Sequence, residues 1–176
     1  MLLFLLSLAT LFAPLLVIYL LIRSESAVWP PPGLPPLPAA LWLSTACLVV
    51  LSGVLHAAVL AARAGERARL RTLLIAALVL TLGFLANQAF CWQQLLSDLA
   101  LQAWRVAGFF YFFTVIHALH VIGGVGPLVL VFANALRGRY GAQNFTGVRL
   151  CAMYWHFLDA VWVVMFCAML WPSPAA

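Results

Sequence analysis

Five long apolar runs, separated by short polar or proline-rich segments, dominate the pattern of residues along this 176-residue chain. A helix needs about 20 apolar residues to cross the hydrocarbon core of a bilayer. Because no water reaches that core, each segment must pair its own backbone groups, as an α-helix does. The pattern therefore predicts an all-α, polytopic membrane helix bundle that forms one membrane domain over residues 1–176. The five transmembrane helices are expected at about residues 2–22, 41–62, 73–92, 106–136 and 150–170.

The composition agrees with a membrane protein and excludes most soluble classes. Hydrophobic residues make up 66% of the chain and charged residues only 7%, whereas soluble domains carry about 25% charged residues. The net charge of +5 would suggest nucleic-acid binding in a soluble protein, but here it comes from arginines between the apolar runs. The four cysteines show no CxxC spacing and are expected to be small buried residues.

The arginines predict the orientation of the chain in the membrane. Seven of the nine lie in two loops, one between the second and third spans and one between the fourth and fifth. Arginine-rich loops face the cytoplasm, so the N-terminus is expected to be cytoplasmic and the C-terminus to lie on the opposite side. The first span lacks a signal-peptide cleavage site and is expected to be retained. Arginines at this face are also candidate contacts for anionic lipid headgroups, a role that simple anchoring explains equally well: Arg63, Arg67, Arg69, Arg71, Arg137 and Arg139.

The last two spans contain ionisable side chains, which are costly inside a bilayer. A charged group at the centre of a membrane helix costs about 2.5–3.5 kcal/mol, yet the fourth span contains His117 and His120 and the fifth contains His156 and Asp159. Residues three apart share one face of a helix, so each pair is expected to point into the protein. There the fourth and fifth helices would hydrogen-bond to each other. The predicted structural network also includes Tyr154, Thr114 and Gln88.

Two other interpretations of these residues remain open from chemistry alone. Neutral imidazole is a common metal ligand, and a chain of ionisable residues inside a membrane can conduct protons. The sequence contains no Glu-x-x-His motif of the di-iron bundles and no evident pair of axial haem positions. It also contains no GxSxG, HExxH or phosphate-binding loop in a usable context. We therefore interpret the residues as a hydrogen-bonded network, with no catalytic, cofactor-binding or metal-binding residue assigned.

Two C-terminal motifs resemble subunit III of the haem–copper respiratory oxidases. The fourth span contains FTVIHALHVIGG, and YWHFLDAVW begins the fifth about 30 residues later. In that family the penultimate helix reads close to TGxHGLHVxxG and the last reads close to YWHFxDxVW. The N-terminal half is similar more loosely, through the linker WPPPGLPPLP, the Ser52-Gly53 step and Gln88. The resemblance covers essentially the whole chain.

The resemblance implies a non-redox accessory subunit of a bacterial haem–copper terminal oxidase, a cytochrome c or quinol oxidase that couples O2 reduction to proton translocation. Short five-helix bacterial members of this family lack two leading helices. They hold no redox cofactor, pack against the catalytic subunit I, which carries haem and copper, and against other oxidase subunits, and bind phospholipid. The chain would then be a multi-pass protein of the bacterial inner membrane, with its C-terminus in the periplasm. It would stabilise the catalytic subunit without carrying a catalytic centre itself.

Two departures from the family pattern affect which functions of the family can be expected of this chain. Acidic positions of the family are occupied by Leu8 in the first span and by Cys91 and Gln94 at the end of the third. These changes remove carboxylates that could relay or collect protons, whereas scaffolding and lipid binding need only packing and hydrogen bonds. The alternative function is a related accessory subunit of a nitric oxide reductase complex. More distant alternatives are a b-type cytochrome and a small transporter.

Overall fold

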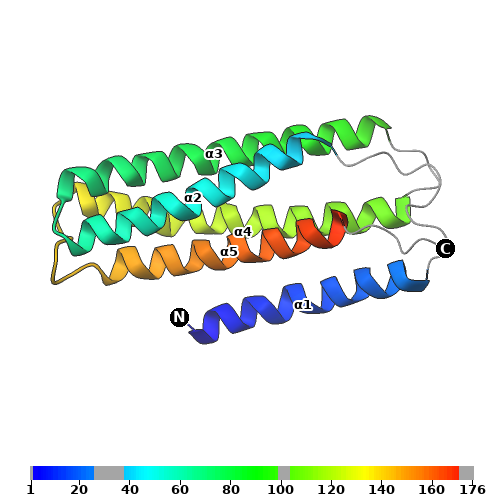
Figure 1. Ribbon diagram of the computed structural model, residues 1–176, viewed down its shortest axis with the longest axis horizontal. Helices are drawn as coiled ribbons and strands as arrows, with labels where there is room; N and C mark the ends of the chain where they lie inside the picture. The colour runs from blue at the N-terminus through cyan, green and yellow to red at the C-terminus, as the bar shows by residue number, and fades with distance from the viewer. Residues whose placement is uncertain (1, 26–37, 99–103, 171–176) are drawn as a thin grey trace.

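The computed structural model describes residues 2–25, 38–98 and 104–170, and in these ranges the chain folds into five α-helices (Figure 1). Most of the proline-rich linker lies outside the described residues. An isolated bridge between Gly141 and Asn144 is the remaining regular pairing that these ranges contain. The helices are α1 (Leu2–Glu25), α2 (Ala40–Arg63), α3 (Arg67–Asp98), α4 (Trp104–Leu136) and α5 (Thr146–Leu170).

Each of these helices contains a stretch that is long and apolar enough to cross a membrane, which confirms the predicted all-α bundle with five membrane helices. All five helices extend beyond the predicted spans, and α3 and α5 do so by the most residues. α3 runs over Arg67–Asp98 rather than residues 73–92, and α5 begins at Thr146 rather than at residue 150. Hydropathy marks the part of a helix that sits in hydrocarbon, whereas backbone pairing continues into polar residues beyond it.

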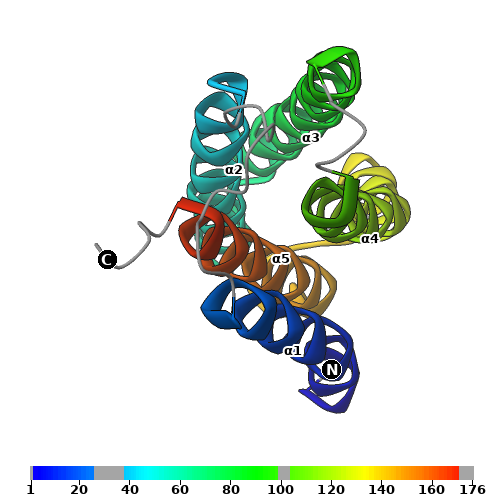
Figure 2. The same cartoon turned by 90° about the vertical axis from the view of Figure 1, so that its right-hand side faces the viewer.

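Four of the helices surround a common core, and the first lies outside them. α2 packs against α3 and α5, and α4 also packs against α3 and α5, so that the four form a closed ring. α1 lies outside this ring against α5 and α4, as the end-on view shows (Figure 2). α5 therefore has neighbours on three sides, and half of its membrane-spanning window is buried.

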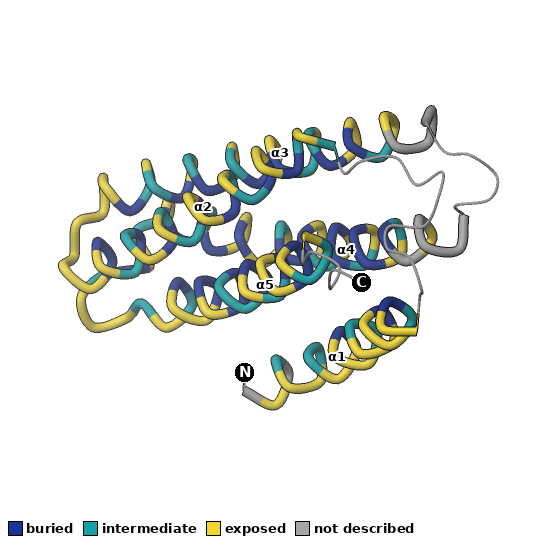
Figure 3. The backbone as a smooth tube through the Cα atoms, turned by 45° about the vertical axis from the view of Figure 1, so that its right-hand side comes forward, coloured by how far each residue is buried: buried dark blue, intermediate teal, exposed yellow. Residues whose placement is uncertain are grey.

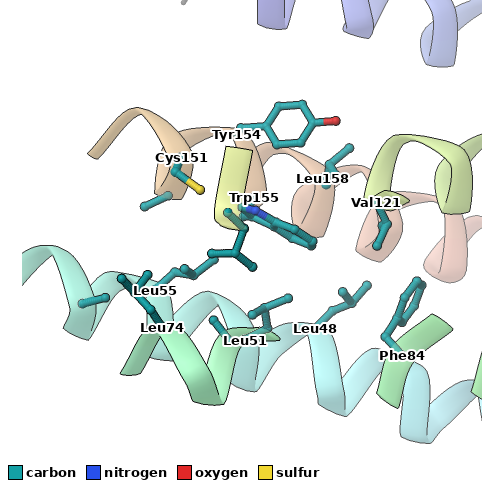
Figure 4. Close-up of a cluster of buried hydrophobic side chains, with 14 of the residues drawn as sticks. Leu48, Leu51, Leu55, Leu74, Phe84, Val121, Cys151, Tyr154, Trp155 and Leu158 are labelled. Carbon is teal, nitrogen blue, oxygen red and sulfur yellow. The ribbon is translucent and has the colours of Figure 1, made fainter. Parts of the chain in front are cut away.

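Trp155 of α5 lies at the centre of the main hydrophobic core. Its side chain is fully buried and lies beside Leu48, Leu51 and Leu55 of α2 (Figure 4). These leucines recur at helical spacing, so one stripe of α2 faces the core. The outward stripes of the helices are exposed but also apolar (Figure 3). A helix that is hydrophobic on all sides is typical of a membrane span.

The two arginine-rich loops lie at the same end of the bundle (Figure 1). Gly65 in the first loop and Gly138 in the second have positive φ values of 75° and 68°. After Gly65, the Glu66 amide donates to the Ala61 carbonyl at 2.9 Å, and the same pattern follows Gly138. This is the Schellman arrangement, which ends a helix through a residue in the left-handed region. Glycine adopts that conformation without a steric penalty, so α2 and α4 both end sharply at this face.

α1 contacts the bundle along most of its length, and Leu5 and Leu8 near its start are partly buried against the main core. Phe12 and Tyr19 are buried in a second apolar cluster with Phe113 of α4 and Met165 of α5. Arg23, which follows the predicted span of residues 2–22, is buried in the last turn of α1. It donates from Nη1 to the Ala168 carbonyl at 2.9 Å. This bond joins the C-terminal turns of α1 and α5.

Candidate functional site

Side-chain hydrogen bonds join each pair of neighbouring helices around the four-helix ring. In membranes such bonds contribute about 0.6 kcal/mol on average and up to about 1.7 kcal/mol, so several together fix how the helices pack. The bonds are Asn87 Nδ2 to Ser44 Oγ (2.8 Å) between α3 and α2, Trp92 Nε1 to Thr114 Oγ1 (2.9 Å) between α3 and α4, Tyr154 Oη to the His120 carbonyl (2.8 Å) between α5 and α4, and Trp162 Nε1 to Thr45 Oγ1 (3.0 Å) between α5 and α2.

His117 of α4 lies at the centre of a group of aromatic rings. Its ring centroid is 5.1 Å from Trp162, 5.8 Å from Phe84 and 6.5 Å from Phe12. The side chain is fully buried, and neither ring nitrogen has a hydrogen-bond partner within the described residues. Gln88 of α3 is equally buried, and its amide is likewise unpaired there. His117 therefore contributes through ring packing in this core.

His120 lies nearer the α1 side of α4 and has a local partner. Its Nδ1 donates to the Ile116 carbonyl at 2.7 Å, one turn earlier in the same helix. The ring packs on Phe12 of α1 with centroids 5.2 Å apart. Because the His120 carbonyl accepts from Tyr154, this residue contacts α1 through its ring and α5 through its backbone.

The expected bonds from His156 and Asp159 to the histidines of α4 are not formed among the described residues. His156 Nδ1 instead lies 2.6 Å from Ser52 Oγ of α2. The prediction of the partner helix was therefore wrong. Tyr154 and His156 are two positions apart, about 200° around a helix, so when Tyr154 reaches α4, His156 points toward α2.

The polar residues of α2 and α5 line an open groove between these two helices. The groove has a volume of about 500 Å³ and is lined by Val49, Ser52, Gly53, His56, His156, Asp159 and Val163. His56 is exposed, His156 is half-buried, and their ring centroids are 6.3 Å apart. Asp159 is only 6% exposed, and Ser52 lies near its carboxyl group. Neither carboxylate oxygen has a hydrogen-bond partner within the described part of the chain.

Ser52 and His56 are residues of this groove that the sequence did not single out as a site. They lie four positions apart on α2 and therefore share one face of that helix. That spacing was a usable signal, but in the sequence Ser52 was noted only as part of the Ser52-Gly53 step of the family resemblance. The contact with α5 follows from the packing of two spans that are 104 residues apart in sequence, Ser52 to His156.

Close approach of α4 and α5 depends on one of the three glycines that follow His120. A side chain at Gly124 would place its Cβ 2.7 Å from Cε1 of Tyr154 and 3.1 Å from Cζ2 of Trp155. Gly123 and Gly126 have nothing within 4 Å of such a Cβ. Small residues let membrane helices approach closely, and at this contact Gly124 serves that purpose.

Three of the six candidate lipid-contacting arginines have partners within the chain. Arg71 donates to the Ala135 and Leu136 carbonyls at 3.2 and 3.1 Å, which joins the start of α3 to the end of α4. Arg69 forms an exposed ion pair with Glu66 at 3.1 Å. Arg139 donates to Asn134 Oδ1 at 3.0 Å. The other three are exposed at the same end of the bundle: Arg63, Arg67 and Arg137.

The three positions where the family carries acids differ in how far they are buried. Leu8 of α1 is partly buried against the main core, and Cys91 of α3 is fully buried in it. Gln94 is exposed near the end of α3. Asp159 is thus the one acidic residue in the interior of a predicted span. Within the described ranges, no group of three or more His, Cys, Asp or Glu side chains is placed to hold a metal ion.

Long apolar helices joined by partly buried hydrogen bonds define the class as a multi-pass helical membrane protein. The family model for cytochrome c oxidase subunit III matches residues 1–173. The chain therefore belongs to the cytochrome c oxidase subunit III family, the accessory subunit of haem–copper oxidases. This confirms the family predicted from the two C-terminal motifs.

Relatives from different bacterial groups agree with this assignment. Cytochrome c oxidase subunit 3 of Synechocystis sp. is 32% identical over 166 residues, covering 93% of this chain and 70% of the relative. The protein of the same name from Thermostichus vulcanus is 30% identical over 167 residues, covering 94% and 82%. A probable cytochrome c oxidase subunit 3 of Mycobacterium tuberculosis is 28% identical over 160 residues, covering 88% and 77%. These matches do not favour the nitric oxide reductase alternative.

Proposed function

We propose that this chain docks through its membrane helices onto the haem- and copper-bearing subunit I of a bacterial oxidase and stabilises that catalytic subunit. The observation that carries the proposal is the groove between α2 and α5, where ionisable groups remain open on a bundle that is otherwise joined by internal bonds. Such groups are costly against lipid, so a protein neighbour accounts for them. The family, whose name is that of an oxidase subunit, supports the same assignment.

A purification experiment tests this proposal. A tag on this chain should recover an oxidase that contains a haem-bearing subunit, identified by mass spectrometry and by a reduced-minus-oxidised haem spectrum. Deletion of the chain should lower the amount of assembled oxidase in the membrane without changing the position of its haem bands. Recovery of the chain alone, or with a nitric oxide reductase in place of an oxygen-reducing enzyme, would contradict the proposal.

The same proposal includes an inner-membrane location with the arginine-rich end in the cytoplasm. Both arginine-rich loops lie at one end of the bundle, and arginine-rich ends are retained on the cytoplasmic side. In a variant whose four native cysteines are replaced by alanine, a cysteine introduced at the exposed Ala64, in the α2–α3 loop, should react with a membrane-impermeant maleimide only after the cytoplasmic side is opened. Reaction in intact spheroplasts would show the opposite orientation and contradict this part of the proposal.

Phospholipid binding at that end is the last part of the proposal. Arg63, Arg67 and Arg137 are exposed there, and clustered arginines attract anionic headgroups by about 1 kcal/mol each. Replacing these three with glutamine should reduce the anionic phospholipid that copurifies with the oxidase. Gln143→Ala, at an exposed uncharged residue of the α4–α5 loop at the same end, is the control and should leave it unchanged.

A further inference from the structure

The groove between α2 and α5 lies at the middle of the membrane-spanning segments. Ser52 is eleven residues before Arg63, where α2 ends, and Asp159 is eleven residues before Leu170, where α5 ends. Eleven residues of helix span about 16 Å, which is about half the thickness of a hydrocarbon core. Lipid headgroups and bulk water are therefore too far away to pair with these side chains.

The polar groups in the groove are only partly satisfied within the chain. Ser52 and His156 bond to each other, but both oxygens of the Asp159 carboxyl are unpaired within the described residues. His56 points into the same opening and is exposed. An acyl chain that filled the groove would offer no hydrogen bond to either residue, and an unpaired polar group in hydrocarbon is strongly unfavourable.

The outward faces elsewhere in the ring show what a lipid-facing surface of this protein looks like. Exposed residues near the middle of α3 and α4 include Val79, Leu82 and Leu119, all apolar. The α2–α5 face differs because it combines valines with two histidines and a carboxyl group. The chemistry of this face therefore fits a polar protein surface, not lipid.

We propose that the groove between α2 and α5 is the docking site for a transmembrane helix of another oxidase subunit, and that this helix carries a side-chain O–H or N–H group that donates to the Asp159 carboxyl. The inference rests on the proposed function, since it names the surface through which that association occurs. A neutral donor such as a hydroxyl or amide pairs the carboxyl and adds no further charge. A second copy of this chain would instead double the ionisable groups to be desolvated.

Photocrosslinking in native membranes tests the position of this site. A benzoylphenylalanine replaces Val49, which lines the groove and is 57% exposed, or Val79 of α3, which is 62% exposed and is the matched control. Irradiation should link the Val49 derivative to another oxidase subunit with at least about tenfold higher yield than the Val79 derivative. Equal yields, adducts with lipid alone, or adducts with a second copy of this chain would each overturn the inference.

Substitutions at Asp159 test the chemistry of the contact. Asp159→Leu should accumulate in the membrane at the wild-type level but recover at least about tenfold less of the partner subunit, equivalent to about 1.4 kcal/mol. Asp159→Asn keeps a side-chain oxygen that accepts the proposed bond and should restore most of the recovery. The complex that still forms should have an unchanged haem spectrum. Normal recovery with Asp159→Leu, or an altered spectrum, would overturn the assigned role.

The two proposals can fail separately. If the tagged wild-type chain recovers no oxidase subunit at all, the proposed function itself is wrong. If it recovers the oxidase but the Val49 derivative forms no adduct with it, the function stands and the docking surface lies elsewhere.

Discussion

The two histidine-bearing regions of the bundle differ in what surrounds the imidazoles. His117 is enclosed by aromatic rings from α1, α3 and α5, and its nitrogens are unpaired within the described residues. His156 is half-buried, bonds to Ser52 and faces His56 across an open groove. Both residues come from the same pair of family motifs, yet the first contributes to internal packing and the second to a surface.

This difference shows that a polar residue in a membrane helix has no fixed role. Inside a closed ring, an imidazole can be retained as a flat ring that packs well, without a hydrogen bond. Between two helices at the outer face, the same side chain bonds to a serine, beside a carboxyl group that has no hydrogen-bond partner within the described residues. The local environment decides which property of the residue matters. Two pairs of substitutions and one single substitution can test that contrast.

The largest expected effect comes from adding a side chain at a closed contact. Gly124→Leu should lower the free energy of unfolding by about 3 kcal/mol, because its Cβ would overlap the rings of Tyr154 and Trp155. Gly53→Leu enters the open groove, where nothing lies within 4 Å of the new Cβ, and should change it by less than about 0.5 kcal/mol. Thermal unfolding of the purified chain in detergent measures both, and equal losses would remove the distinction between core and groove.

A smaller effect is expected when each histidine is replaced by leucine. His156→Leu removes the bond to Ser52 and should cost about 1 kcal/mol. His117→Leu replaces a buried, unpaired imidazole with an apolar side chain of similar volume and should be neutral or slightly stabilising. SDS titration of the chain in mixed micelles reports the two values. A greater loss at His117 would mean that its nitrogens are bonded in the folded protein.

The smallest effect is expected from a single interhelical bond inside the ring. Tyr154→Phe removes the donor to the His120 carbonyl, which lies 2.8 Å away, and keeps the aromatic ring. The expected loss is about 0.6 kcal/mol, the average for such bonds in membranes. The same titration should detect it, and a loss above about 1.7 kcal/mol would assign the hydroxyl a further role beyond this one bond.

Much of the fold could be predicted from the sequence because membrane helices are defined locally. Hydropathy located all five spans, and the arginines marked two loops that do lie at one end of the bundle. Helix ends were less predictable. Arg23 continues α1 and bonds to α5, and α3 extends beyond its apolar part, because neither feature changes the hydropathy that marks a span.

The candidate site could be predicted only in part. The pair His156 and Asp159 was visible as an anomaly in an apolar run, but the sequence did not indicate that Ser52 and His56 of α2 are its neighbours. Which helix an inward residue meets depends on the rotation of each helix about its own axis. That rotation is set by packing, for example by the contact of Gly124 with Tyr154 and Trp155, and no single span encodes it.

The sequence by itself determined the class, the number of spans, the likeness to subunit III and the presence of costly polar groups, because each of these depends on residue type and on spacing along one helix. The tertiary structure alone decided that α2 and α5 share an open polar groove while His117 is sealed among aromatic rings. Those outcomes depend on how five apolar rods pack against one another. Since every face of such a membrane helix is hydrophobic, hydropathy alone does not predict which face packs against the other helices.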